Sequence, residues 1–133
     1  MTEERKKKIL IVDDEVFIVE TVKFALEHAG YECAAAYDGI EAVKMTREYE
    51  PDLILLDIML PKLNGFKVCR LLKFDEKFKH IAIIMMTART QEKDHALGLE
   101  TGANEYMTKP FEIDAMLRLV QKYLAPAGNP TQA

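Results

Sequence analysis

The sequence has 133 residues, the length of one domain, and its 49% hydrophobic and 30% charged residues are ordinary for a soluble globular protein. This composition excludes a disordered chain. With 22 acidic and 18 basic residues the net charge is -4, which argues against a nucleic-acid binder or a protein of anionic membranes. The one basic run, Arg5 to Lys8, is interpreted as a solvated lead-in to the first strand.

The cysteines and the N-terminus indicate a reducing compartment. Cys33 and Cys69 have no CxxC spacing and fall inside predicted regular elements, which favours free thiols over a disulfide or a metal site. The N-terminus is charged where a signal peptide would be apolar. The longest apolar run, Ile81 to Met86, is too short to span a bilayer. We therefore expect a cytoplasmic protein with no membrane attachment.

Five short apolar runs alternate with segments of helical period along the chain. Apolar residues that stand side by side, instead of alternating with polar ones, are typical of strands covered on both faces, and such strands form parallel sheets. The expected strands are Ile9 to Val12, Tyr31 to Ala36, Leu53 to Leu56, Ile81 to Met86 and Ala103 to Met107.

Amphipathic segments between and after these runs are predicted to be helices. Asp38, which has Glu41 three residues later, is placed to cap the second helix. Asn64 is placed to cap the third helix. The apolar positions of the first helix are Val19, Val22, Leu26 and Ala29, those of the third Phe66, Val68, Leu71 and Leu72, and those of the last Ile113, Met116, Leu117, Val120 and Leu124.

Strand followed by helix, five times over, predicts an open, doubly wound α/β domain with a five-stranded parallel sheet and five helices on its two faces. Right-handed crossovers leave few topologies. The domain is expected over residues 8–124. Residues 1–7 form the charged lead-in, and residues 125–133, which contain proline and glycine, form a flexible tail or the start of a linker.

Polar side chains stand at the ends of four of the five expected strands. They are Asp13, Asp14 and Glu15 after the first strand, Asp57 after the third, Thr87 after the fourth and Lys109 after the fifth. Each alone has an ordinary structural explanation as a cap, a turn residue or a surface charge. However, ligands of open parallel sheets bind beyond the carboxyl ends of the strands, so together these residues predict a functional site.

Three carboxylates in one cleft need a compensating charge. Two of them about 4 Å apart repel by about 4 kcal/mol at an effective dielectric near 20. Either one acid is protonated or a cation binds there. All-oxygen ligands suit Mg²⁺ better than Zn²⁺, and His28, His80 and His95 show no ligand spacing.

Lys109 opposite this cluster would neutralise an anion, most plausibly a phosphoryl group. If one carboxylate is the nucleophile, the product is an aspartyl phosphate, and Thr87 is placed to donate to it. Asp57 suits the nucleophile because its strand is flanked by the strands of the acid pair and of Thr87.

These residues resemble the response-regulator receiver domain of two-component signalling, from Ile9 to Leu124. The resemblance implies the flavodoxin-like strand order 2-1-3-4-5, the order known for the chemotaxis regulator of this family. The motifs that carry it are ILIVDDE at strand 1, DLILLDIMLPKLNGF around Asp57, IIMMTA ending at Ala88, and GANEYMTKPF ending at Phe111.

The resemblance assigns a role to each site residue. Asp57 would be the phosphoacceptor, and it would ligate Mg²⁺ together with Asp14 and the backbone carbonyl of Met59, with Asp13 acting mainly through water. Lys109, which precedes a cis proline, would bind the phosphoryl group. Thr87 would move toward the phosphate and Tyr106 would swing inward, which would reshape the face made by helix 4, strand 5 and helix 5.

The resemblance also implies partners. A histidine kinase or a histidine phosphotransfer protein would donate the phosphoryl group. A downstream effector or an output domain absent from this chain would receive the signal, and the chain itself would bind neither nucleic acid nor membrane. Met59 and Arg89, which vary within the family, are expected to slow the loss of the phosphoryl group by hindering water.

Three other functions share parts of this pattern. A phosphatase of the haloacid dehalogenase type needs a DxDx[TV] motif that strand 1 lacks. A flavodoxin-like cofactor binder needs glycines or hydroxyls after strand 1, where acids would repel a phosphate. A receiver that works by contact alone, without phosphate, is the hardest to separate from a phosphorylated one.

Overall fold

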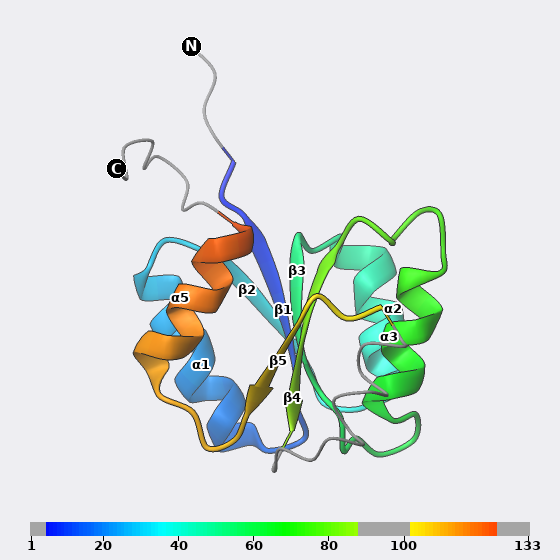
Figure 1. Cartoon of the computed structure of the whole chain (residues 1–133), viewed down its shortest axis with the longest axis horizontal. Helices are drawn as coiled ribbons and strands as arrows, with labels where there is room; N and C mark the ends of the chain where they lie inside the picture. Colours follow the sequence, from blue (N-terminus) through cyan, green and yellow to red (C-terminus); the bar gives the residue numbers. More distant parts are fainter. Residues whose placement is uncertain (1–4, 88–101, 125–133) are drawn as a thin grey trace.

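The computed structural model describes residues 5–87 and 102–124, and its centre is a sheet of five parallel strands in the order β2-β1-β3-β4-β5 (Figure 1). The expected fold class and strand order are thus confirmed. The strands are β1 (Lys8–Val12), β2 (Glu32–Ala36), β3 (Leu53–Asp57), β4 (Ala82–Thr87) and β5 (Glu105–Thr108).

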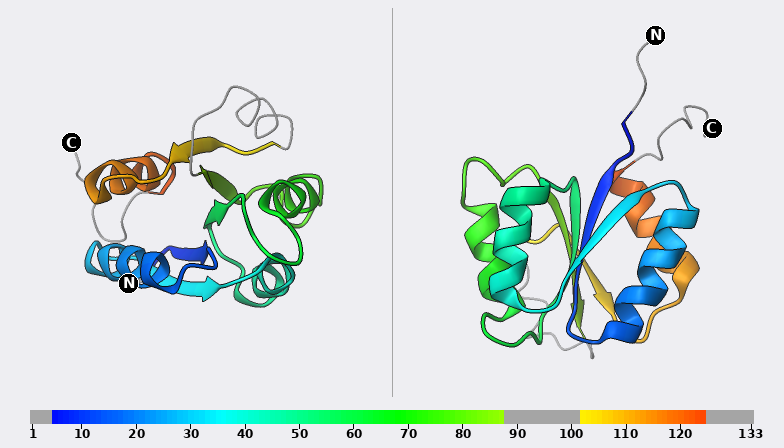
Figure 2. Two further views of the ribbon diagram at one scale, coloured as in Figure 1. Left: turned by 90° about the horizontal axis from the view of Figure 1, so that it is seen from below. Right: turned by 180° about the vertical axis from the view of Figure 1, so that it is seen from behind.

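Helices cover both faces of the sheet. Figures 1 and 2 show α1 and α5 side by side on one face and α2 and α3 on the other. The fourth of the five expected helices would fall between β4 and β5, in residues 88–101, which lie outside the described residues. The four described helices are α1 (Val16–His28), α2 (Gly39–Tyr49), α3 (Gly65–Lys73) and α5 (Ile113–Tyr123).

The two expected helix caps are confirmed. Asp38 Oδ1 accepts a hydrogen bond of 2.7 Å from the Glu41 backbone N–H, and Asn64 Oδ1 accepts one of 3.0 Å from the Lys67 backbone N–H. The Glu41 carboxylate completes the first cap by accepting from the Tyr37 backbone N–H at 2.8 Å. Both helices therefore begin at residues that the sequence specifies.

Strand residues alternate between two separate hydrophobic cores. Ile9, Ile11, Leu53 and Leu55 pack with α1 and α5, whereas their neighbours along β1 and β3 pack with α2 and α3. Since successive side chains of a strand point to opposite faces, a sheet covered on both sides needs an apolar residue at every position. This explains the uninterrupted apolar runs of the sequence.

The two cysteines agree with the sequence-based expectation of unpaired thiols within the described residues. Cys69 is buried, Cys33 is partly buried, and both are free thiols.

Tyr31 Oη donates to the backbone carbonyl of Leu124 at 2.9 Å and so fixes the end of α5 against the start of β2. None of the described helices has both the length and the apolar character needed to cross a bilayer.

Candidate functional site

The polar residues predicted at the strand ends lie at the same edge of the sheet. Asp13 follows β1, Asp57 ends β3, Thr87 ends β4 and Lys109 follows β5. One oxygen each of Asp13, Asp14 and Asp57 lie within 4.8 Å of one another. The fold therefore converts residues far apart in the sequence into one acidic cluster.

Asp13 is the most deeply buried of these acids, with no exposed surface. Its backbone N–H donates to the Ala36 carbonyl at 3.2 Å, which extends the pairing of β1 with β2 by one residue. Its Oδ1 accepts from the Glu15 backbone N–H at 2.9 Å, and its Oδ2 pairs with Lys109 Nζ at 2.7 Å. Asp14, in contrast, is exposed to solvent.

Asp57 lies at the end of the central strand β3 and is only 4% exposed. Its Oδ1 accepts from the Met59 backbone N–H at 3.3 Å, and its Oδ2 lies 3.6 Å from Lys109 Nζ. Burial and then the negative charge of Asp13 raise the pKa of Asp57 to about 6, against the opposing effect of Lys109. One ammonium is thus too little charge to compensate this group of acids.

Lys109 reaches into the cluster from the end of β5, where its backbone N–H donates to the Thr87 carbonyl at 2.6 Å. Burial lowers the pKa of its ammonium, but the contacts with Asp13 and Asp57 outweigh this effect and the net shift is upward. The bond between Lys109 and Pro110 is cis, as expected. The lysine is therefore charged where an anion would enter.

The structure also gives Lys109 a partner that the sequence did not predict. Glu15 begins α1 without using its side chain as a cap, and its Oε1 lies 3.2 Å from Lys109 Nζ. The sequence signal for this contact was the run of three consecutive acids, Asp13 to Glu15, after an apolar strand. Sequence alone could not show which of them reaches a lysine 94 positions away.

Thr87 and Tyr106 occupy neighbouring strands behind the acids. Thr87 is 4% exposed at the end of β4, and its partner in the ladder with β5 is Thr108. Tyr106 is partly buried on β5 and packs against the core on the α2 and α3 side. The hydroxyl of Thr87 therefore belongs to the same edge as the carboxylates, with Tyr106 in the adjoining strand.

Two residues, Met59 and Arg89, were expected to slow the loss of the phosphoryl group, and the structure describes only the first of them. The Met59 side chain is 72% exposed, two residues beyond Asp57. Arg89 lies outside the described residues. The site therefore has an exposed apolar side chain two residues after its central carboxylate.

The acidic cluster has the chemistry of a magnesium site. Its donors are carboxylate oxygens, the ligands that Mg²⁺ prefers. One oxygen of each carboxylate lies within 4.8 Å of the others, close enough for one ion and its bound water to contact all three. The raised pKa of Asp57 is the effect expected of buried carboxylates with too few cations around them. These residues therefore fit a hard divalent cation.

Comparison with known proteins identifies the class to which this fold and site belong. The family model of the response regulator receiver domain matches residues 9–121, so the chain belongs to that family. Receiver domains of two-component response regulators act in phosphorylation-dependent signalling. They interact with histidine kinases and output domains, generally bind Mg²⁺ at an acidic pocket, and generally release their phosphoryl group by themselves.

Two curated relatives are transcriptional regulators. The chain is 42% identical over 126 residues to the DNA-binding dual master transcriptional regulator RpaA of Synechocystis, covering 95% of this chain and 52% of that protein. It is 47% identical over 117 residues to the alkaline phosphatase synthesis transcriptional regulatory protein PhoP of Bacillus subtilis, covering 86% and 48%. The chain thus spans about half the length of these relatives.

Solved structures of single receiver domains match nearly the whole chain. The chemotaxis protein CheY4 of Vibrio cholerae has a TM-score of 0.85 at 31% identity, covering 90% of this chain and all of that one. A CheY-like receiver domain protein of Methanospirillum hungatei has a TM-score of 0.83 at 28% identity, covering 89% and 93%. The fold alone therefore does not separate chemotaxis regulators from transcriptional ones.

Proposed function

We propose that this chain is a phosphorylation-dependent switch in which Asp57 accepts a phosphoryl group with the help of Mg²⁺. The observation that carries the proposal is the buried Asp57 carboxylate between Asp13 and Lys109 at the carboxyl edge of the sheet. Asp13, Asp14, Asp57 and the backbone carbonyl of Met59 would hold the ion. When bound, Mg²⁺ would offset the negative charge of the carboxylates and of the phosphoryl oxygens.

The reaction needs a nucleophile, a cation and a hydrogen-bond donor around one phosphorus atom. A carboxylate oxygen of Asp57 attacks the phosphorus of a phosphohistidine, a P–O bond forms, and the P–N bond breaks as the imidazole leaves with the electron pair. The Lys109 ammonium leaves its contact with Asp57 and pairs with a phosphoryl oxygen. Thr87 donates its hydroxyl to another oxygen, and Tyr106 moves inward behind it.

Partners are proposed from the exposed surface around the site. Phe17 and Phe24 of α1 are 79% and 73% exposed, and Phe17 lines a hollow of about 230 Å³ together with Lys109 and Pro110. An apolar surface beside the phosphoacceptor suits a histidine kinase or a phosphotransfer protein. The signal would pass from β5 and α5 to an effector or an output domain, in the cytoplasm and without direct contact of this chain with nucleic acid or membrane.

Intact mass after incubation with acetyl phosphate tests the phosphoacceptor. We expect one added phosphoryl group on the wild type only when Mg²⁺ is present, no addition on Asp57→Ala, and normal addition on Asp114→Ala, which removes an exposed carboxylate from α5. A label that persists on Asp57→Ala would contradict the assignment. Failure to label the wild type, under conditions that label another receiver, would favour a protein that signals by contact alone.

Phosphoryl lifetime is expected to depend on Met59 and Arg89. The double variant Met59→Asn with Arg89→Glu should lose its phosphoryl group several-fold faster than the wild type, because shorter and more polar side chains admit water. The measurement is the decay of the added mass after the donor is removed. Leu71→Asn, an exposed apolar position on α3, serves as the control and should decay like the wild type. Equal rates for the double variant and the wild type would refute the effect.

A further inference from the structure

The outer side of α3 carries apolar side chains that the core does not use. Val68, Cys69 and Leu72 are buried, but Leu71 is 54% exposed and Phe74, at the end of the helix, is 70% exposed. Leu71, one of the apolar positions expected on this helix, lies outside the core-facing arc, which its three buried neighbours fill. A large apolar surface therefore remains on this side of the molecule.

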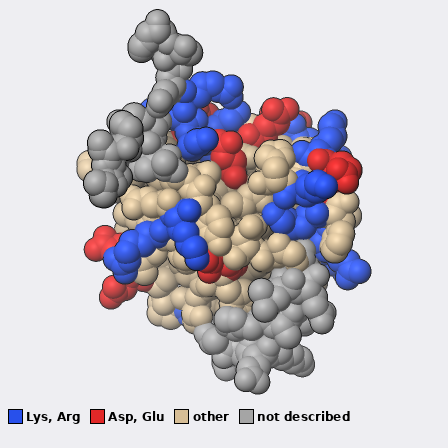
Figure 3. Space-filling model, turned by 45° about the horizontal axis from the view of Figure 1, so that its top comes forward, with Lys and Arg blue, Asp and Glu red and all other residues tan. Residues whose placement is uncertain are grey.

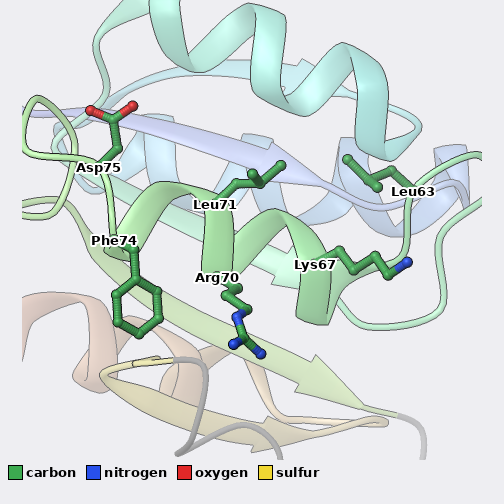
Figure 4. A pocket seen from close by; sticks show the side chains of 6 residues that line it. All are labelled: Leu63, Lys67, Arg70, Leu71, Phe74 and Asp75. Atoms are coloured by element: carbon green, nitrogen blue, oxygen red, sulfur yellow. The ribbon is translucent and has the colours of Figure 1, made fainter.

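This surface is hollowed on both sides of α3. One hollow of about 630 Å³ is lined by Leu63, Leu71 and Phe74, and a second of about 480 Å³ in the seam between α2 and α3 shares Leu63 and Leu71 with it. Figure 4 shows Leu63 and Leu71 on the side of α3 toward α2, and Phe74 with Arg70 on the other side. Ile40 of α2, 56% exposed, extends the apolar lining. We call this continuous surface the α2–α3 groove.

Basic residues line the α2–α3 groove along both helices. Lys44 and Arg47 contribute from α2 and Lys67 and Arg70 from α3, whereas Glu48 and Asp75 are the carboxylates of the two linings, so four cations face two anions. In Figure 3, Lys and Arg side chains lie together with some Asp and Glu side chains on the side of the molecule where α3 lies. Within residues 5–87 and 102–124 no ion pair neutralises any of these four cations. The groove is thus net positive on a chain whose net charge is -4.

Backbone contacts hold the end of the groove near Leu63. The Gly39 backbone N–H donates to the Pro61 carbonyl at 3.2 Å, and a side chain at Gly39 would overlap the Leu63 carbonyl. The Arg70 guanidinium lies 5.9 Å from the centre of the Phe74 ring, a cation–π contact between the two exposed side chains. A preformed surface loses little conformational entropy when it binds a partner.

We propose that the α2–α3 groove binds an acidic, amphipathic helical segment of another protein. The segment would place apolar side chains on Leu63, Leu71 and Phe74 and carboxylates opposite the cations of both helices. This is the helix-in-groove mode of recognition, in which apolar anchors repeat at i, i+3 or i+4, and i+7. The cations would set the orientation and speed the encounter.

The shape and charge of the groove favour this partner over others. A nucleic acid would use the cations but would leave the exposed Leu71 and Phe74 without apolar partners. A bilayer surface is flat on this scale, whereas the apolar residues line two hollows. A second copy of the chain could present α1, whose exposed Phe17 and Phe24 are seven residues apart. That helix carries Lys23 between Glu20 and Glu27, so it offers the four cations less negative charge than an acidic segment would.

Peptide display on the whole chain tests the proposal. A random library of peptides of about 16 residues, long enough for four helical turns, is selected on the immobilised wild type after depletion on Phe74→Asp. We expect the selected peptides to combine Asp and Glu with apolar residues at helical spacing. The Kd of a synthetic representative, from fluorescence anisotropy, should rise at least tenfold for Phe74→Asp and severalfold for Arg70→Glu, and should also rise with salt.

The controls separate the groove from other surfaces and from the phosphoacceptor site. Phe24→Asp changes a side chain of nearly equal exposure on α1, and Asp57→Ala removes the proposed phosphoacceptor, so both variants should bind the peptide like the wild type. Circular dichroism confirms that each variant is folded. The proposal would be overturned by selections that yield no peptides, or only basic ones, or peptides that bind Phe74→Asp as tightly as the wild type.

Two further measurements address the rival partners. Sedimentation with phosphatidylcholine and phosphatidylserine vesicles should leave the protein in solution, and sedimentation velocity should show a monomer at all accessible concentrations. Vesicle binding that Phe74→Asp abolishes would instead assign the groove to a membrane. Self-association that the same substitution abolishes would assign it to a second copy. Either result would overturn the proposed partner.

Discussion

Asp57→Asn is expected to raise the free energy of unfolding of the metal-free protein by about 3 kcal/mol near pH 7.5. The folded protein raises the pKa of Asp57 from 3.8 to about 6, so it binds this proton more tightly than the unfolded chain does. Because the folded state then binds more protons between about pH 4 and pH 6, the stability of the wild type falls as the pH rises through that range. Asparagine does not ionise and avoids this loss.

Thermal unfolding at two pH values measures the effect. The Tm of Asp57→Asn should exceed that of the wild type by several degrees near pH 7.5, and the difference should shrink toward zero near pH 4. Mg²⁺ should then stabilise the wild type more than the variant, because the variant lacks one proposed ligand. Asp114→Asn, an exposed carboxylate on α5, should change stability by no more than about 0.5 kcal/mol. A gain that grows toward acid would contradict this electrostatic account.

Gly65→Ala is expected to destabilise the protein by about 3 kcal/mol. Gly65 begins α3 against the strand that carries Asp57, and a Cβ there would overlap the Asp57 carbonyl and come within 2.8 Å of the Ile58 Cα. Both are buried backbone atoms, one at the end of β3 and one in the residue after it, and cannot move aside like a flexible side chain. The variant should also accept the phosphoryl group more slowly, because relief of the overlap displaces the proposed nucleophile.

Gly30→Ala provides the matched control for this steric argument. Gly30 has a φ of 103° and open space around its Cα, so alanine there meets only the backbone preference against positive φ, about 1 kcal/mol. Urea unfolding compares the two variants, and acetyl phosphate labelling compares their rates under conditions where both are folded. An equal or larger loss for Gly30→Ala, with normal labelling of Gly65→Ala, would show that the packing of Gly65 on β3 is unimportant.

The architecture could be predicted from the sequence because both faces of the sheet are covered. Uninterrupted apolar runs identified the strands, and caps at Asp38 and Asn64 identified two helix starts. The strand order came from family resemblance, since periodicity carries no information on which strands are neighbours. Boundaries were less accurate. The predicted fifth strand began at Ala103, which packs against the core, whereas strand pairing begins at Glu105.

The site was predictable to the extent that it depends on strand ends. Asp13, Asp57, Thr87 and Lys109 had to meet because parallel strands finish at one edge. Side-chain reach was not predictable, so the contact between Glu15 and Lys109 was missed. The exposure of Leu71 could not be predicted for a related reason, since the helical period places a residue on an arc of the helix but does not say how wide an arc the core covers.

The division of the strand side chains between two cores has a consequence for how this sequence can change. Insertion of one residue into β1 or β3 would exchange the residues that serve the two cores and disrupt both at once. Substitutions on opposite sides of the sheet share no packing neighbours, so their costs should add without compensating one another. The surface over α2 and α3 and the surface over α1 and α5 can therefore diverge separately in evolution, while the strands between them tolerate no change of length.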